Sequence, residues 1–502
     1  MNTPSREVFR KYTDDQTFDR IIEFGTVSEM WSRCSKEFAD AVAITDAQNE
    51  YTYAQLDEDT ARFRTLLKSD DGKPCIGILS SNSYDFVKAF IAAATLGYSS
   101  LILPAHLDDK SIYGCCMMYG VNTLVFKSDL DDKVQLVKNM APHIRLIPIE
   151  QSSDVRTEAC ECEPSDACAM MFTGGTTGKS KVAVLSNEAV MQGTVNGCYG
   201  YREVFGLKYM LHLPLSHVFG LIRNMMTSLY TGSNMFICAN NVDLFRDIER
   251  FRPNILVTVP ALAEMALSLS RKFGRNMLGK DMKYIICGAA MVSPYLIRAY
   301  HEQGIEMFAG YGLTESANLV SGNPESLTKP ESVGIPYPNQ QLRVENGELW
   351  LKGKNIMIGY VGADNSEAFE DGWFKTGDLV RFDDEGYLYI VGRIKEIIVL
   401  PSGENISPAE VETRFNELPF VQDSQVFEDI DEQGRHILAL EIVPRASEIA
   451  KLCVEDSGAY MMEELEKVNK VLPSFERVQR ITIRTTDFAR TPSMKIARYH
   501  KC

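Results

Sequence analysis

Short apolar runs alternate with helical periods in the first third of the chain. Strand-like runs at 76–80, 99–103 and 123–127 enclose helical stretches at 84–96 and 108–119. This alternation predicts βαβ units around a parallel sheet.

A second alternation of the same kind follows further along the chain. It has strand-like runs at 255–259, 284–287 and 306–308, one helix that ends at 270 and another at 294–303. The two alternations predict a large N-terminal region built from two βαβ-layered subdomains.

The apolar period shortens from about Ser332. Glycine-rich turns separate runs at 341–344, 347–351 and 387–391, which predicts a small antiparallel, barrel-like β element. Beyond Lys395, helices at 408–417 and 460–472 flank strands near Gln425 and at 436–443. We therefore predict an α/β fold with a large domain at 1–394 and a small, mobile α+β domain at 395–502.

Charge and apolar content exclude several partners. A formal net charge of −16 opposes binding to nucleic acid or to an anionic membrane, because either surface attracts a basic patch. Residues 1–16 lack the apolar core of a secretory signal, and the longest apolar stretch, 89–104, is interrupted and too short to cross a bilayer. We expect a cytoplasmic protein without an integral membrane segment.

Cysteine usage agrees with a reducing compartment. The twelve cysteines are scattered along the chain. Cys160, Cys162 and Cys168 cluster, but their spacing is poor for zinc and no histidine is near.

The segment from Met171 to Lys181, MFTGGTTGKSK, is the strongest candidate for phosphate binding. Its glycines allow close backbone approach, and its hydroxyls, N–H groups and lysines suit oxyanions. A Walker A loop is disfavoured, because Thr173 stands where that motif requires glycine and an apolar strand-like run follows. For this loop alone, a simple hairpin turn is the alternative.

Further motifs follow in order: PLSHVFG at 214–220, GYGLTE at 310–315, TGDL at 376–379, GRIKEII at 392–398 and RTPSMKI at 490–496. Together with the loop they resemble the adenylate-forming, AMP-binding superfamily, and the C-terminal segments are most similar to fatty acyl-CoA synthetases. The resemblance is specific from residue 171 onwards and vague before it. It implies an acid–thiol ligase that uses ATP, Mg²⁺ and coenzyme A.

The resemblance assigns roles to residues of this sequence. Lys495 is the expected electrostatic catalyst, Thr314 the donor to phosphate, Glu315 the magnesium ligand and Lys395 the hinge. The expected nucleotide-binding residues are Thr173, Gly174, Gly175, Thr176, Thr177, Gly178, Lys181, Gly288, Ala289, Ala290, Gly310, Tyr311, Gly312, Asp378 and Arg393. Among these, the resemblance implies that 288–290 and 310–312 enclose adenine, and that Asp378 and Arg393 bind the ribose. For Asp378 the alternative is an ordinary turn aspartate.

The same motifs imply an acyl pocket formed by His217, Phe219, Arg223 and Asn318. His217, expected to gate this pocket, could instead be an ordinary core or surface histidine. Arg223 follows Phe219 by one helical turn, so it either lies in the pocket and binds a polar or second anionic group, or turns outward to a surface acid.

The substrate is expected to be a fatty or other non-amino acid, since no aspartate for an α-ammonium group occurs in 218–222. The acid is joined to AMP, with release of pyrophosphate, and is then transferred to a thiol. The acceptor is coenzyme A or, alternatively, a separate phosphopantetheinyl carrier protein. A degenerate nucleotide- or acyl-binding regulator and a luciferase-like oxygenase are further alternatives, and the oligomeric state is open.

Overall fold

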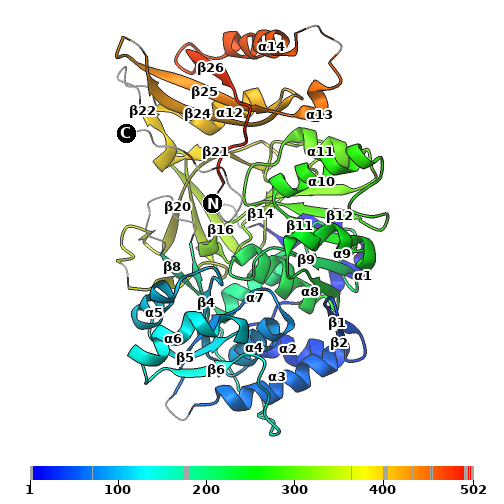
Figure 1. Ribbon diagram of the computed structural model, residues 1–502, viewed down its shortest axis with the longest axis vertical. Coiled ribbons are helices and arrows are strands. Elements are labelled where there is room, and N and C mark those ends of the chain that lie inside the picture. Colours follow the sequence, from blue (N-terminus) through cyan, green and yellow to red (C-terminus); the bar gives the residue numbers. More distant parts are fainter. Residues whose placement is uncertain are drawn as a thin grey trace.

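The computed structural model describes residues 4–69, 72–173, 181–362, 364–399, 405–431, 433–452, 454, 456–490, 496 and 498. Two large sheets with a layer of helices between them form the bulk of the molecule, and a smaller α+β unit caps one end (Figure 1). The predicted α/β class is confirmed.

A seven-stranded sheet contains the first predicted alternation, in the order β18-β8-β7-β4-β3-β5-β6. Its central strands pair in parallel, whereas β8 and β18 pair antiparallel. The strands are β3 (Cys75–Leu79), β4 (Ser99–Leu103), β5 (Val121–Phe126), β6 (Arg145–Pro148), β7 (Ala167–Phe172), β8 (Val182–Ser186) and β18 (Gly359–Tyr360).

A nine-stranded sheet contains the second alternation, in the order β15-β14-β13-β12-β11-β9-β10-β1-β2. The strands from β13 to β1 in this order pair in parallel. The strands are β1 (Val42–Thr45), β2 (Glu50–Thr52), β9 (Lys208–Leu211), β10 (Asn234–Ile237), β11 (Ile255–Thr258), β12 (Tyr284–Cys287), β13 (Glu306–Tyr311), β14 (Ser321–Gly322) and β15 (Ile335–Pro336).

Helices fill the space between these sheets and cover their outer faces. Eleven of the twelve residues of α4 are buried, as expected for a helix enclosed on all sides, and one apolar cluster extends through both sheets. The helices of this region are α1 (Asp15–Arg20), α2 (Val27–Glu37), α3 (Tyr53–Leu67), α4 (Tyr84–Thr95), α5 (Asp109–Met118), α6 (Asp131–Met140), α7 (Asn187–Asn196), α8 (Thr227–Tyr230), α9 (Leu244–Phe251), α10 (Pro260–Phe273) and α11 (Pro294–His301).

Short helical turns complete the region. They are η1 (Arg6–Tyr12), η2 (Ser128–Leu130), η4 (Asn241–Asp243), η5 (Thr314–Ser316) and η6 (Ile394–Glu396), together with η3 (Phe219–Met226), which is a π-helix. π-helical turns are rare and occur frequently at functional sites.

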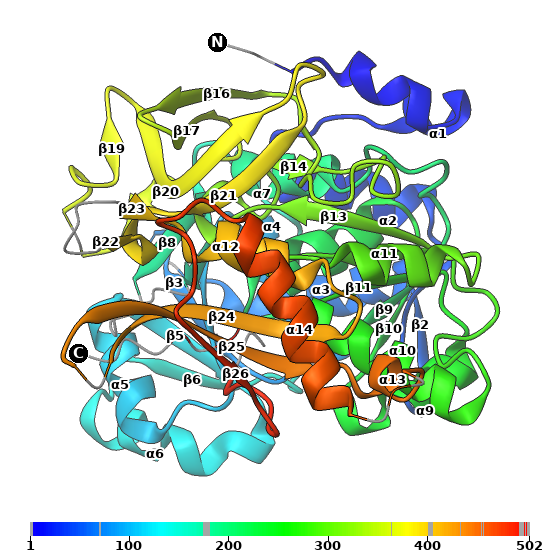
Figure 2. The same cartoon turned by 90° about the horizontal axis from the view of Figure 1, so that it is seen from above.

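The expected antiparallel β element is a five-stranded sheet centred on β20. Its strands are β16 (Gln340–Glu345), β17 (Glu348–Gly353), β19 (Phe369–Glu370), β20 (Trp373–Phe382) and β21 (Leu388–Arg393). It lies beside the smaller α+β unit (Figure 2).

The smaller unit has its own apolar core. Helices α12 and α14 pack on a three-stranded sheet, whose third strand pairs in parallel with the second. Its elements are α12 (Pro408–Asn416), β24 (Val421–Ile430), β25 (His436–Pro444), α13 (Ala446–Ile449), α14 (Ser457–Val471) and β26 (Arg480–Ile483), preceded by the hairpin β22 (Ile398–Val399) and β23 (Asn405–Ile406).

None of the helices in the described part has the length and apolar character that a membrane crossing requires. The cytoplasmic location stays a prediction.

Candidate functional site

The carboxyl ends of β12 and β13 bring the expected adenine-binding residues together. These strands are parallel neighbours, so Gly288, directly after β12, lies beside Gly310. A β-carbon on Gly288 would lie 3.4 Å from the oxygen of Gly310 and 3.5 Å from the Phe219 ring. Ligands of open α/β sheets bind at this edge. Ala289 and Ala290 follow in exposed positions, and Ala289 has a φ of +65°.

Gly312 is required by the turn after β13. A β-carbon there would lie 1.1 Å from the oxygen of Asn318, which is a collision. The N–H of Asn318 donates back to the oxygen of Leu313 at 2.9 Å, and the Ser316 hydroxyl accepts from the Leu313 N–H at 3.0 Å. The turn therefore fixes Thr314 and Glu315, which lie in η5.

Asp378, Arg393 and Tyr311 form a hydrogen-bonded group in which Asp378 is buried and the other two are half-buried. Asp378 on β20 and Arg393 on β21 are register partners, and Nε of Arg393 donates to Oδ1 of Asp378 at 2.5 Å. The Tyr311 hydroxyl donates to Oδ2 at 2.5 Å. Burial, together with the negative charge of Asp378, raises the pKa of Tyr311 well above its usual value. The structure thus brings both predicted ribose ligands together.

Glu315 lies beside the end of the phosphate-loop segment. Its carboxylate accepts a hydrogen bond from the Tyr360 hydroxyl at 2.7 Å, and Nζ of Lys181 lies 4.7 Å from the centre of the Tyr360 ring. Burial and the nearby Glu315 charge raise the pKa of Tyr360. Sequence reasoning missed Tyr360, because it belongs to none of the motifs and reaches the site only through the pairing of β18 with β8.

One carboxylate is compatible with magnesium at this position. Mg²⁺ usually takes one or two protein carboxylates and completes its shell with water and substrate phosphates. The described residues contain no group of three or more His, Cys, Asp or Glu that could hold a metal by themselves. Glu315 therefore suits a metal that arrives with a nucleotide better than a resident one.

The start of the expected acyl pocket is formed by the π-helix η3. Gly220 is packed against the preceding segment, since a β-carbon there would lie 2.4 Å from the oxygen of Pro214. Half-buried His217 lies just before the helix, and its main-chain oxygen accepts from the N–H of Leu221 at 2.9 Å.

Arg223 is buried at 1% exposure, so the alternative in which it turns outward is wrong. Asn318 is buried as well, at 7%. The structure therefore places two of the four predicted pocket residues in the interior, whereas His217 and Phe219 are half-buried.

Some predicted site residues lie outside the described part of the chain. These are Gly174, Gly175, Thr176, Thr177, Gly178 and Lys495. Thr173, at the base of the loop, donates its N–H to the oxygen of Lys181 at 2.9 Å, so the two ends of the loop are adjacent. The predicted hinge, Lys395, lies in η6 between β21 and β22.

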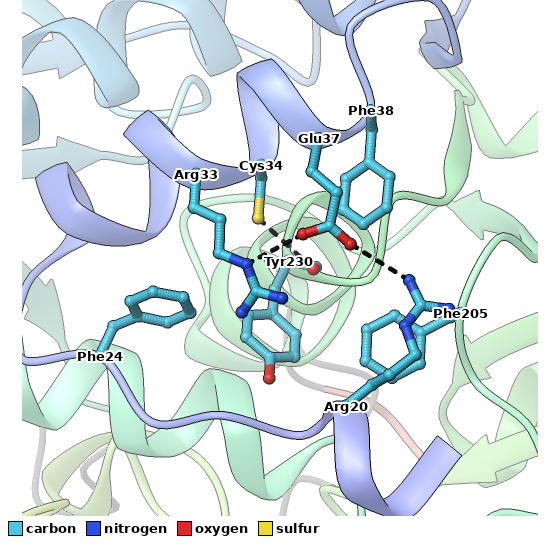
Figure 3. A pocket seen from close by; sticks show the side chains of 8 residues that line it. All are labelled: Arg20, Phe24, Arg33, Cys34, Glu37, Phe38, Phe205 and Tyr230. Carbon is cyan, nitrogen blue, oxygen red and sulfur yellow. Dashed lines mark hydrogen bonds and ion pairs between the residues drawn. The ribbon is translucent and has the colours of Figure 1, made fainter. Parts of the chain in front are cut away.

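A separate small cavity can be set aside. It has a volume of about 10 Å³ and lies between α2 and the Phe205 and Tyr230 rings (Figure 3). Nε of Arg33 and Nη2 of Arg20 donate to the Glu37 carboxylate beside it, at 2.9 and 3.4 Å. A cavity of this size holds at most one water, so it is no substrate site.

Two family models match this chain. The model of the AMP-binding enzyme covers residues 31–361, and that of the AMP-binding enzyme C-terminal domain covers 395–501. The chain belongs to the AMP-binding enzyme family. The predicted family is therefore confirmed, as is the class of AMP-forming acid–thiol ligases.

Curated relatives match over most of their length. An indoleacetate–CoA ligase of Aromatoleum aromaticum is 28% identical over 80% of this chain and 85% of its own. An oxalate–CoA ligase of Arabidopsis thaliana is 26% identical over 94% and 97%.

Solved structures share the fold. An anthranilate CoA ligase in complex with anthranoyl-AMP superimposes with a TM-score of 0.81, at 18% identity, over 95% of this chain and 96% of its own. An o-succinylbenzoate coenzyme A synthetase from Bacillus subtilis, in complex with ATP and a magnesium ion, has a TM-score of 0.76 at 22% identity, over 93% and 98%. The expected ATP, Mg²⁺ and coenzyme A agree with these names.

Proposed function

We propose that this enzyme joins a non-amino carboxylic acid to AMP and then transfers the acyl group to coenzyme A. In the first step a carboxylate oxygen bonds to the α-phosphorus of ATP, and the bond to the β-phosphate oxygen breaks to release pyrophosphate. In the second step the thiol sulfur bonds to the acyl carbon, the thiol proton is lost, and AMP leaves.

The observation that carries this proposal is the convergence of two preorganised groups, Glu315–Tyr360–Lys181 and Asp378–Arg393–Tyr311, in one AMP-binding fold. Donors and charges fixed before the reaction stabilise the charge that develops during phosphoryl transfer.

Each group has its own role in this proposal. Asp378 accepts hydrogen bonds from the ribose hydroxyls, with Arg393 holding it in place. Glu315 would hold a magnesium ion, which would supply positive charge against the departing pyrophosphate. Lys495 neutralises charge at the acyl carboxylate and the α-phosphate, and Lys395 is the hinge between the domains 1–394 and 395–502.

The acyl group is less narrowly defined than the reaction. The relatives named above are ligases of indoleacetate and oxalate, and a solved neighbour is a Mycobacterium tuberculosis fatty acyl CoA synthetase, at 22% identity. These names favour coenzyme A as the acceptor over a carrier protein. A plain fatty acid is one option among several. The paired state of Asp378 and Arg393 opposes the degenerate regulator.

A pyrophosphate-release screen over carboxylic acids, with and without coenzyme A, tests the proposal. We expect acid-dependent pyrophosphate release and, with coenzyme A, an acyl-CoA product.

In Lys495→Ala, ATP–pyrophosphate exchange should fall about 10²- to 10³-fold, the typical cost of one preorganised donor. Thioester formation from synthetic acyl-adenylate should survive. Equal loss of both half-reactions would contradict the role of Lys495.

A further inference from the structure

Arg223 is a buried cation for which no described residue supplies an anion. Its side chain ranks among the largest fully buried ones, and none of its nitrogens, Nε, Nη1 or Nη2, donates a hydrogen bond to any described residue. No ion pair of the described part includes it. Burial of a guanidinium is costly unless an anion or several acceptors pair with it.

The neighbours of Arg223 are aromatic and carry no charge to match it. Its Cζ lies 5.3 Å from the centre of the Tyr201 ring, and Tyr209 and Tyr337 are also close to it. A cation–π contact offsets only part of the cost of desolvation, and the hydroxyls of Tyr201 and Tyr209 near the guanidinium are neutral, so they supply no negative charge. The position therefore suits an anion brought in from outside the protein.

Arg223 lies on the same helix that begins at the nucleotide site. Phe219 starts η3, and its ring contacts the position at Gly288 where the expected adenine residues converge. Arg223 is four residues further along this helix. A ligand with one end beside Phe219 would present its other end towards Arg223.

A second buried donor belongs to the same part of the molecule. The Asn318 side-chain nitrogen is buried and has no hydrogen-bond partner among the described residues. Ile222 and Ala317, the residues directly before the two donors, both lie against Gly193 of α7. A β-carbon on Gly193 would lie 3.0 Å from the Ile222 side chain and 2.2 Å from the oxygen of Ala317. The segments that bear Arg223 and Asn318 therefore pack against one surface.

We infer that the acid activated by this enzyme carries a second anionic group, most simply a second carboxylate, which Arg223 binds. A carboxylate matches the planar guanidinium fork and accepts two parallel hydrogen bonds from it. The Asn318 amide donates a further hydrogen bond to the same group. This inference rests on the proposed function and defines its substrate class as dianionic acids.

The test is a comparison of matched acids. Acyl-CoA synthesis by the full-length enzyme is measured with straight dicarboxylates of four to eight carbons and with the monomethyl ester of each. The ester keeps the same chain between the two carboxyl groups and removes one negative charge. We expect at least one diacid to exceed its monoester in kcat/KM by about 10-fold or more, the usual discrimination of a site built around a charged hydrogen bond.

Three variants test whether Arg223 causes the preference for diacids. They are Arg223→Met, Arg223→Lys and the control Arg250→Met. Arg250 is an exposed arginine of α9 that donates to the main-chain oxygen of Ala47. Arg223→Met should raise the KM for the diacid about 10-fold or more and leave the monoester nearly unchanged. Arg223→Lys should keep part of the preference, and Arg250→Met all of it.

The possible failures are distinguishable. If wild type makes acyl-CoA but prefers the monoesters, the inference falls and the proposed ligase function stands. Retention of the diacid preference in folded Arg223→Met would also overturn the inference. If no acid supports pyrophosphate release, both fall. Should Arg223→Met fail to fold, the wild-type comparison of each diacid with its monoester alone decides.

Discussion

The two carboxylates of the site, Asp378 and Glu315, differ in how firmly they are held. Asp378 is 2% exposed and is held by two donors from different elements, Arg393 and Tyr311. Its charge is therefore fixed in position before a nucleotide arrives, which reduces the reorganisation that binding requires. Glu315 is half-buried and is bonded to one hydroxyl among the described residues, so it retains free acceptor capacity.

Asp378→Asn should weaken ATP binding. The amide keeps the shape but loses the charge that pairs with Arg393, and hydrogen bonds to charged groups contribute about 1.5–3 kcal/mol. We expect the KM for ATP in ATP–pyrophosphate exchange to rise about 10-fold or more, with little response to added magnesium. Asp384→Asn, a change of an exposed aspartate on the same hairpin, is the control. An unchanged KM for ATP in Asp378→Asn would refute the ribose role.

Glu315→Gln and Tyr360→Phe should separate metal binding from positioning. Glu315→Gln removes a hard anionic ligand, so the magnesium concentration for half-maximal exchange should rise about 10-fold and the defect should ease at high magnesium. Tyr360→Phe keeps the ring beside Lys181 and removes only the hydroxyl, so the shift should be smaller. Superimposable magnesium titrations for wild type and Glu315→Gln would count against the metal site.

His212 should make stability depend on pH. It is buried, its Nε2 lies 3.1 Å from the Thr258 hydroxyl, and burial lowers its pKa to about 4. The histidine of the unfolded chain is protonated below about pH 6.5, whereas that of the folded chain stays neutral down to about pH 4. The free energy of unfolding therefore decreases as the pH is lowered from about 6.5 to about 4. At pH 5 this amounts to about 2 kcal/mol.

Thermal unfolding at pH 7.5 and pH 5 checks this expectation. His212→Asn removes the titrating group, so the Tm advantage of wild type over the variant should shrink at pH 5. The exposed His301→Asn is the control, because its ring stays in solvent on folding. A wild-type advantage of equal size at both pH values would contradict the assignment.

At this scale the sequence suggested candidate site residues but not their organisation. Motif residues such as Asp378 and Glu315 could be named in advance because each belongs to a contiguous pattern. Tyr360 could not, since its contact with Glu315 spans 45 positions and depends on strand pairing. The buried state of Arg223 also depends on tertiary packing, which helical spacing alone does not determine.

At the scale of elements, local patterns predicted the bounds well. The helix expected at 84–96 is α4 (Tyr84–Thr95), and the strand expected at 99–103 is β4. Strand neighbours were less accessible. The nine-stranded sheet joins β1 to β10, far apart in sequence, and no local signal specifies that pairing. The π-helical form of η3 was likewise not anticipated, because its apolar pattern is compatible with an ordinary helix.

Gly312→Ala tests the turn that presents Thr314 and Glu315. The new β-carbon would collide with the Asn318 carbonyl, so the turn must move, and we expect a lower Tm and loss of most ATP–pyrophosphate exchange. Gly114→Ala in α5 is the matched control. Outside its own helix, no atom of the described residues lies within 4 Å of its β-carbon position, and alanine favours a helix over glycine by about 1 kcal/mol. Full activity in Gly312→Ala would show that the turn is not needed.

At the scale of the whole molecule, the smaller unit contacts the larger one through α13. Nε and Nη2 of Arg445, just before α13, donate to the Glu264 carboxylate on α10 at 2.7 and 3.3 Å. The Tyr295 hydroxyl on α11 donates to Glu448 at 2.7 Å. Figures 1 and 2 both show α13 beside α10. If residues 395–502 rotate about Lys395 during the reaction, as we propose, these contacts belong to one orientation only.

Arg445→Met should therefore alter the balance between the half-reactions. Removal of one partner of a buried ion pair is strongly destabilising, by about 3–5 kcal/mol. The part of that cost that comes from Glu264 applies to a single orientation, whereas the hydrogen bond from Arg445 to the Pro419 oxygen lies within the smaller unit. We expect the ratio of ATP–pyrophosphate exchange to thioester formation from synthetic acyl-adenylate to change about 10-fold or more, because only one half-reaction uses the orientation that these contacts stabilise.

Arg484→Met is the control for this prediction. Arg484 donates to Glu441 at 2.6 Å, and both residues belong to the smaller unit, so the substitution removes an ion pair without touching the contact at α13. It should leave the ratio unchanged even if both rates fall. Lys395→Pro, which fixes φ at the proposed hinge, should preserve exchange and block thioester formation. If Arg445→Met reduced both half-reactions equally, as a general loss of stability would, the contact at α13 would have no part in domain rotation.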